Sequence, residues 1–168
     1  MMKAVAHRGP DGRGEYLSPE ISLGHTRLAI LDTSTRGKQP MFSPDQNVVS
    51  VFNGEIYNFK ELRNMYLNEY TFHSNSDAEV IPYLYDKFGI DFIDKLRGVF
   101  AIAIYDRRLK VLYLIRDRFG VKPLYYTFQE KTLFFSSELK SFTNLSQVTT
   151  EIDFERYIEY LGFQFVPG

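Results

Sequence analysis

The most restrictive feature of this chain is a series of short runs, rich in aromatic and β-branched residues, in its second half. These runs predict strands at residues 100–105, 111–115, 124–128 and 133–136. Short polar turns separate them. Consecutive strands with such short connections must be antiparallel neighbours, because a parallel pair needs a crossover of a dozen or more residues. The second half of the chain is therefore predicted to form antiparallel sheet.

Two more strands are predicted in the first half of the chain. Residues 21–31 carry apolar side chains among polar ones, and residues 48–52 form a short apolar run. Asn53 and Gly54 follow that run directly, and because this pair tolerates positive φ we predict a tight turn there. Residues 7–14 are predicted to form a loop, because glycine and proline interrupt both helical and strand periodicity.

Helical periodicity occupies the middle of the chain. Asn58 is placed to cap a helix whose apolar residues fall on one side. Ser76 and Glu79 form a capping-box pattern, which introduces a second apolar helical segment ending near Gly89. Pro82 lies inside that segment, and we predict a kink there because proline has no amide hydrogen and crowds the preceding turn.

The order of these elements predicts the fold class. A short helix near residues 92–96 and a final helix over residues 153–161 complete the pattern. The chain of 168 residues fits one domain, and its 44% hydrophobic content favours an ordered core. Helices packed against antiparallel sheets would bury the apolar faces of both, so the predicted class is α+β.

Composition excludes several kinds of function. The net charge is −1 and no basic stripe occurs, which argues against nucleic acid or an anionic membrane surface as the main partner. No apolar run approaches the roughly 20 residues that span a bilayer, and no signal peptide opens the chain. The absence of cysteine excludes disulfides, thiolate metal sites and cysteine catalysis within these residues. The expected compartment is the cytoplasm.

Several polar residues stand at the ends of the predicted elements. Arg27 interrupts an apolar strand, where its guanidinium can grip a carboxylate or simply face solvent. Asn53 and Gly54 can present an amide and a backbone N–H to a developing oxyanion, or form an ordinary hairpin turn. Asp77 lies in the first turn of a capped helix, where the dipole favours negative charge anyway. Glu55 also fits a plain surface position, so no single residue is specific.

The sequence predicts no metal site and no nucleotide cofactor within these residues. The three histidines His7, His25 and His73 have no mutual spacing that suggests metal ligands, and each fits a surface or hydrogen-bonded position. The chain contains no phosphate-binding loop, no dinucleotide-binding glycine motif and no serine nucleophile elbow.

Six ordered segments carry a family resemblance. They read HRGPDG (7–12), GHTRLAILD (24–32), FNGEIYN (52–58), SDAEV (76–80), RDRFGVKPLYY (116–126) and SSELK (136–140). In order and spacing they resemble the class II glutamine amidotransferase domain of asparagine synthetases, over nearly the whole chain. The resemblance implies an N-terminal-nucleophile hydrolase fold, a four-layer αββα sandwich of two antiparallel sheets. It also implies hydrolysis of glutamine to glutamate and ammonia.

The resemblance assigns a role to each candidate residue. Arg27 resembles the residue that holds the glutamine α-carboxylate, and Asn53 and Gly54 resemble the oxyanion hole. Glu55 and Asp77 resemble the group around the α-amino end of the substrate. Ile30 resembles a position that touches glutamine through its backbone. The physical requirement agrees, because a zwitterionic amino acid needs a cation, an anion and donors at the scissile amide.

The chain departs from the family at both ends. Family members open with a cysteine nucleophile on a leading strand, whereas residues 1–6 here resemble the end of a helix. We therefore expect a domain at residues 1–150 that is incomplete at its N-terminus and inactive as it stands. Residues 151–168 are expected to begin the connection to an absent synthetase domain, where the family uses ATP and magnesium.

Three readings of function follow from the resemblance. The first is the glutaminase half of a glutamine-hydrolysing asparagine synthetase, with glutamine as its ligand. The second is a related amidotransferase that serves another acceptor, and the third is a non-catalytic glutamine-binding domain. Loss of the leading strand would leave an exposed sheet edge, through which we expect the chain to form a homo-oligomer.

Overall fold

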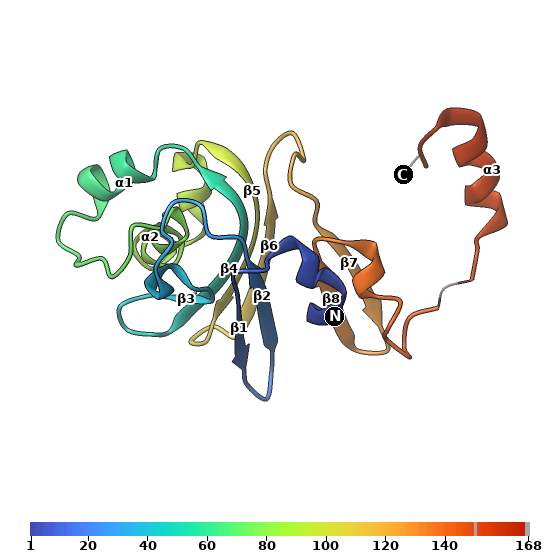
Figure 1. The fold of residues 1–168 in the computed structure, drawn as a ribbon, viewed down its shortest axis with the longest axis horizontal. Helices are drawn as coiled ribbons and strands as arrows, with labels where there is room; N and C mark the ends of the chain where they lie inside the picture. The colour runs from blue at the N-terminus through green and yellow to red at the C-terminus, as the bar shows by residue number, and fades with distance from the viewer. Residues whose placement is uncertain (150, 167–168) are drawn as a thin grey trace.

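The computed structural model describes residues 1–149 and 151–166, and Figure 1 shows the path of the chain. The α-helices are α1 (Phe59–Tyr66), α2 (Val80–Phe88) and α3 (Phe154–Phe163). Short 3-10 helices are η1 (Met2–Arg8), η2 (Thr35–Gly37), η3 (Asp77–Glu79), η4 (Gly89–Lys95) and η5 (Leu139–Ser141). The strands are β1 (Gly12–Leu17), β2 (Ser22–Arg27), β3 (Met41–Phe42), β4 (Val48–Ile56), β5 (Gly98–Asp106), β6 (Val111–Arg116), β7 (Tyr125–Gln129) and β8 (Thr132–Ser136).

A four-stranded antiparallel sheet in the order β3-β4-β5-β6 forms the centre of the molecule (Figure 1). Its longest ladder joins β4 to β5, from the pair Val48↔Asp106 to the pair Ile56↔Gly98. The hairpins β1–β2 and β7–β8 form two separate two-stranded sheets, which are also antiparallel. The predicted antiparallel pairing is confirmed within each sheet.

The prediction that all consecutive strands are neighbours was wrong for β6 and β7, which lie in different sheets. A braced turn between them takes the chain out of the central sheet. The buried carboxylate of Asp117 organises this turn by accepting the backbone N–H groups of Phe100, Phe119, Val121 and Lys122. Because a side chain satisfies these donors, the chain can turn without forming a strand ladder.

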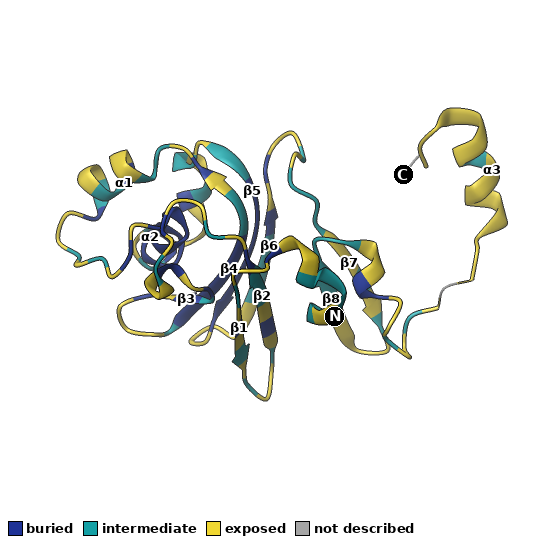
Figure 2. Cartoon of the chain, viewed as in Figure 1, coloured by how far each residue is buried: buried dark blue, intermediate teal, exposed yellow. Residues whose placement is uncertain are grey.

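Opposite faces of the central sheet are covered by different layers. The larger apolar cluster joins the sheet to the helices and includes Phe52, Ile102, Ile104, Leu84 and Phe92. The smaller cluster joins the other face to the β1–β2 hairpin and contains Leu23, Val49, Val51, Ala103 and Tyr105. Burial on both faces explains why residues 48–52 of β4 are apolar except for Ser50. Figure 2 shows the buried residues gathered around β4, β5 and α2.

These layers confirm the α+β sandwich. The layer opposite the helices is divided, however, because β1–β2 and β7–β8 do not pair with each other. Helix α3 extends away from this body and has no buried residue (Figures 1 and 2). Within residues 1–149 and 151–166, no helix has the length and apolar character needed to cross a bilayer.

The predicted turn at Asn53 and Gly54 does not exist. Both residues lie inside β4, where they pair with Ala101 and Phe100 of β5. Gly54 has φ of +153°, and a Cβ added there would overlap the carbonyl oxygen of Val99. The glycine is therefore required by close approach of two strands rather than by a change of direction.

Two other predicted boundaries were wrong. Strand β2 ends at Arg27, and the exposed residue Leu28 continues into a loop rather than a strand. The predicted loop at residues 7–14 instead contains the end of η1 and the start of β1 at Gly12. The glycines there pack closely, since a Cβ on Gly9 would overlap the backbone of Thr26 and Arg27. Close backbone packing accounts for glycines that resemble turn signals.

The predicted helix caps form in altered ways. Ser76 accepts the N–H of Ala78, but it caps η3, which leads directly into α2. The carboxylate of Glu79 accepts the backbone N–H groups of His73 and Ser74 instead of returning to Ser76. Pro82 lies in the first turn of α2, where a missing amide hydrogen costs little, and α2 continues to Phe88.

Asn58 precedes α1 but its side chain makes no capping bond. Its amide instead donates to the carbonyl of Lys95 at 2.9 Å and accepts the N–H of Arg97 at 3.0 Å. Helix α1 thus begins where predicted, while the side chain that marks its start fastens the segment between η4 and β5.

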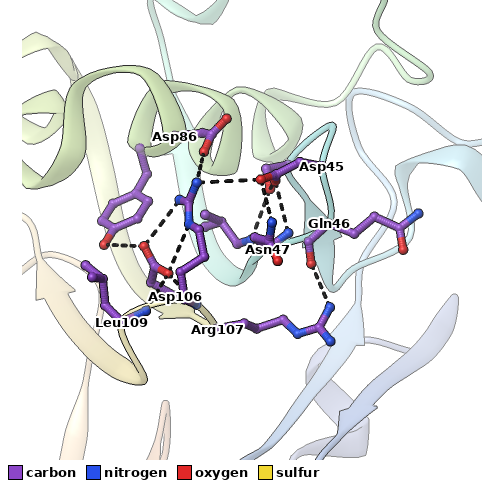
Figure 3. Close-up of polar contacts among 11 residues, drawn as sticks. Asp45, Gln46, Asn47, Asp86, Asp106, Arg107 and Leu109 are labelled. Carbon is purple, nitrogen blue, oxygen red and sulfur yellow. Dashed lines mark hydrogen bonds and ion pairs between the residues drawn. The ribbon is translucent and has the colours of Figure 1, made fainter.

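An ionic network fastens the far end of the central sheet, as Figure 3 shows. The buried carboxylate of Asp106 accepts hydrogen bonds from the Arg108 guanidinium and from the Tyr85 hydroxyl, at 3.3 and 3.2 Å. Arg108 also contacts Asp86 at 2.9 Å and Asp45 at 3.5 Å. One guanidinium therefore links the end of β5, helix α2 and the turn between β3 and β4.

Candidate functional site

One cavity of about 1220 Å³ lies between the central sheet, the β1–β2 hairpin and the β7–β8 hairpin. All six residues singled out in the sequence line it, namely Arg27, Ile30, Asn53, Gly54, Glu55 and Asp77. They come from β2, the loop that follows it, β4 and η3. The structure thus brings together residues that are up to 50 positions apart in the chain.

Arg27 ends β2, and its side chain is buried among loop carbonyls rather than exposed to solvent. Its guanidinium donates to the carbonyl oxygen of Ser34 at 2.6 Å and to that of Asp32. A Cβ added to Gly37 would lie 2.5 Å from Arg27 Nη2, so the loop closes tightly around the charge. Three of the five N–H donors of the guanidinium are not used by these bonds, which leaves capacity to bind an anion.

The loop around Arg27 is itself held by Asp32. The Asp32 carboxylate accepts the hydroxyl and backbone N–H of Ser34, at 2.6 and 2.8 Å, and the N–H of Asn75 at 2.8 Å. These hydrogen bonds, led by the one from the Ser34 hydroxyl, lower the pKa of Asp32 to about 2. The carboxylate therefore stays ionised and ties the Arg27 loop to the segment that precedes η3.

Asn53 is half-buried and lines the cavity, as does Val51 two residues earlier on β4. Its side-chain amide donates to the hydroxyl of Ser137, beyond β8, at 3.4 Å. Gly54 follows at the closest approach of β4 to β5. The amide is thus mounted on a rigid central strand, which suits a donor that must not reorganise during a reaction.

Asp77 and Glu55 form the acidic side of the cavity. The Asp77 carboxylate accepts the N–H of Ile56 at 2.9 Å, which fastens η3 to the end of β4. Burial raises the pKa of Asp77, and the neighbouring charge of Glu55 acts in the same direction, while hydrogen bonds from backbone N–H groups oppose both. Glu55 is exposed. A cation placed between the two carboxylates would relieve their repulsion.

Ile30 lies on the loop that follows Arg27, with 74% of its surface exposed. The N–H of the preceding residue, Ala29, donates to the carboxylate of Asp11 at 2.8 Å. Ile30 therefore sits at the rim of the cavity, and its predicted contact through the backbone stays a prediction.

Three further residues of the site escaped the sequence analysis. Gln39 is buried beside β4, Ser137 contacts Asn53, and His25 lies on the cavity side of β2. Burial lowers the pKa of His25 to about 4, and the charge of Arg27 adds to this, against the opposing carbonyl of Phe52. The sequence assigns His25 to a surface or hydrogen-bonded position, and neither Gln39 nor Ser137 carries a local pattern that signals its partner.

The arrangement of charges suits a small zwitterion. The cavity offers a guanidinium from Arg27, carboxylates from Glu55 and Asp77, and an amide donor from Asn53. Its volume exceeds the needs of one amino acid, and its lining extends over residues of both hairpins, including those of β8. Among the residues that the structure describes, no group of three or more acidic, histidine or cysteine side chains gathers as metal ligands.

Similarity to known proteins agrees with this fold. A solved structure of glutamine phosphoribosylpyrophosphate amidotransferase from B. subtilis matches with a TM-score of 0.62. The match has 24% identity and covers 73% of this chain and 28% of that one. The chain therefore shares the fold of the matched part of that amidotransferase. The chain belongs to the glutamine amidotransferase domain family, which matches residues 1–168.

Two similar relatives are asparagine synthetases (glutamine-hydrolysing) of Bacillus subtilis strain 168. Asparagine synthetase 2 is 43% identical over 141 residues, which cover 84% of this chain and 19% of the relative. Asparagine synthetase 1 is 42% identical over 168 residues, which cover 99% of this chain and 26% of the relative. The chain thus spans about a fifth to a quarter of the length of these curated relatives.

Proposed function

We propose that this chain is the glutamine-binding domain of a glutamine-hydrolysing asparagine synthetase. The observation that carries the proposal is that a single cavity collects Arg27, Asn53, Glu55 and Asp77. In this proposal Arg27 binds the α-carboxylate and the two acidic residues bind the α-ammonium group. Asn53 and Gly54 face the side-chain amide, and Ile30 adds a backbone contact at the rim.

The charges explain why glutamine would be held in one direction. A guanidinium on one side of the α-carbon and carboxylates on the other side fix the orientation of this carbon, because exchanging its two charged groups would bring like charges together. The amide donor of Asn53 then falls at the scissile carbonyl, where it would stabilise negative charge as it develops. In the complete enzyme the released ammonia would serve the ATP-dependent conversion of aspartate to asparagine. ATP and magnesium would belong to the synthetase domain.

Equilibrium binding to the chain tests the proposal. Isothermal titration with glutamine should give saturable binding, and Arg27→Ala should weaken it by about ten- to a hundredfold, the effect of losing a charge-assisted hydrogen bond. Arg107→Ala is the matched control, because Arg107 also donates to a backbone carbonyl but lies outside the cavity. Equal losses in both variants, or no binding by the unmodified chain, would refute the assignment.

The chain should bind glutamine without hydrolysing it. The family nucleophile is a cysteine, and the 168 residues contain none. We expect glutamate release equal to that of a no-protein control, at concentrations where titration shows bound glutamine. Release that depends on Asn53 would instead mean that another group supplies the nucleophile. Binding without hydrolysis also fits the alternative of a non-catalytic glutamine-binding domain.

A further inference from the structure

Gln39 lies between the β1–β2 hairpin, which ends in Arg27, and strand β4, which carries Asn53. These two residues bind opposite ends of glutamine in the proposed site. Its side-chain amide accepts the N–H of Phe52 at 2.7 Å and donates to the carbonyl of Phe52 at 3.1 Å. Phe52 directly precedes Asn53 on β4. Both the glutamine amide and the Phe52 backbone are buried, so neither group has water as an alternative partner.

The two bonds extend the β3–β4 ladder by one step. Strand β3 pairs Met41 with Ser50, and Gln39 and Phe52 lie two residues further along in opposite directions. They would be partners in the same register two positions beyond Met41 and Ser50, but the side chain of Gln39 replaces a strand backbone there. The edge of β4 next to Asn53 is therefore completed by a single side chain.

The main chain of Gln39 meets the opposite layer. A Cβ added to Gly14 would overlap the carbonyl oxygen of Gln39, so the backbone of β1 lies directly against this carbonyl. Gly14 pairs with His25 on β2, two residues before Arg27. The same loop reaches Arg27 from the other side through the carbonyls of Asp32 and Ser34. Gln39 is thus wedged between the hairpin that ends in Arg27 and the strand that carries Asn53.

We propose that Gln39 is a positioning residue that keeps Arg27 and Asn53 at the separation required by glutamine, and so sets discrimination against the shorter amide asparagine. The proposal rests on the proposed function, because it assumes that these two residues bind opposite ends of one amino acid. Asparagine has one methylene less, so it cannot reach both ends of a site held at fixed length. A loosened site would accept both amides more equally.

The test compares glutamine and asparagine binding in matched variants of the full chain. Gln39→Met keeps the side-chain volume and removes both bonds to Phe52. We expect it to lower glutamine affinity about tenfold and to reduce the preference over asparagine by a similar factor, the scale of one methylene. Asn58→Leu is the control, because it also removes an amide that bonds two backbone groups, outside the cavity. It should leave the preference unchanged.

A second measurement does not depend on ligand binding. The NMR resonances of the Asn53 side-chain amide and the Arg27 Nε–H should both shift in Gln39→Met and neither should shift in Asn58→Leu. If Gln39→Met does not fold, Gln39→Glu retains the acceptor for the Phe52 N–H and loses the donor to the Phe52 carbonyl, and both resonances should still shift. Unchanged resonances, or an unchanged preference for glutamine, would overturn the positioning role. A folded wild-type chain that binds neither amide would overturn the proposed function, and the resonances would still decide the role of Gln39.

Discussion

At the scale of single residues, the cavity contains polar side chains that are buried and have exchanged water for protein partners or for none. Arg27 is buried against carbonyls instead of facing water, and Asp77 shares its carboxylate between the end of β4 and the site. His25 has a buried ring nitrogen, Nδ1, with no hydrogen-bond partner among the described residues. Each of these groups is removed from water, so substituting or protonating it should change the stability of the fold as well as ligand binding.

His25 should make the folded chain sensitive to mild acid. Its pKa is about 4 in the folded protein and about 6.5 in the unfolded chain, so only the unfolded state binds a proton between these values. The stability that neutral His25 contributes is therefore complete above pH 6.5 and is lost as the pH falls towards 4. The loss should be on the order of 2–3 kcal/mol.

Urea denaturation at pH 7.5, 6.5, 5.5 and 4.5 measures this loss. The variant His25→Gln cannot titrate, so its stability should fall less over the same range. The carboxylates with a pKa of about 2, among them Asp32 and Asp117, lose their contribution only at lower pH and do not obscure the comparison. Parallel curves for the two proteins would contradict the prediction.

At the scale of elements, strand β4 meets several structural requirements at once. It pairs with β5, buries apolar residues on both faces and presents Asn53 to the cavity. Gly54 is the position where this strand tolerates no side chain, because of its φ and its contact with the Val99 carbonyl.

The substitution Gly54→Ala should therefore destabilise the fold by about 2–4 kcal/mol, the sum of backbone strain and steric displacement. Gly162→Ala in α3 is the control, since a Cβ there meets nothing within 4 Å. That control should be neutral or slightly stabilising, because alanine favours a helix. Urea midpoints of the three proteins decide the matter, and a neutral Gly54→Ala would show that β4 and β5 can separate at this position.

The ionic network of Figure 3 gives a second prediction about elements. Arg108→Ala should cost about 1–3 kcal/mol, because it leaves the buried carboxylate of Asp106 without its cation and unties α2 from the sheet. Arg107→Ala removes the neighbouring guanidinium, which is bonded to the carbonyl of Gln46, and should cost less than about 0.5 kcal/mol. Similar urea midpoints for the two variants would mean that the network contributes little.

At the scale of the whole molecule, the divided layer is the unusual feature. Strands β2 and β8 border the cavity, and within the described residues each pairs with one neighbouring strand, β1 and β7 respectively. Strand β8 also carries apolar side chains that line the cavity, such as Leu133, which is 38% exposed. Unpaired edges next to apolar surface favour pairing with another chain.

We therefore expect the chain to self-associate at micromolar concentration through this groove, measured by light scattering. Leu133→Lys places a charge on β8 and should shift the chain towards the monomer. Leu109→Lys, at an exposed position outside the cavity, is the control and should not. Association that survives Leu133→Lys but is lost in Leu161→Lys would locate the contact on α3 instead. A monodisperse wild-type chain would contradict the prediction.

Much of the fold was predictable because local patterns carry it. The helical segment that follows the Ser76 cap, its end at Gly89 and the strands β5, β6, β7 and β8 follow from periodicity and turn residues. Glycine was the least reliable signal, because the same residue serves turns and close backbone contacts. At Gly54 and Gly9 the contact was the reason, and it involves residues far away in the chain. The domain boundary expected at residue 150 lies outside the described residues and stays a prediction.

The sequence by itself determined the elements, the family and the residue types that a glutamine site requires, because these depend on short segments and their order. Only the tertiary structure decided that Arg27 is buried, that Asn53 lies inside a strand, and that Gln39 joins their two layers. These facts depend on which backbone groups lack a partner once the sheets have packed. A buried carbonyl or N–H needs a hydrogen-bond partner, and this partner can come from any segment that packs nearby. No local sequence pattern shows which segment that is.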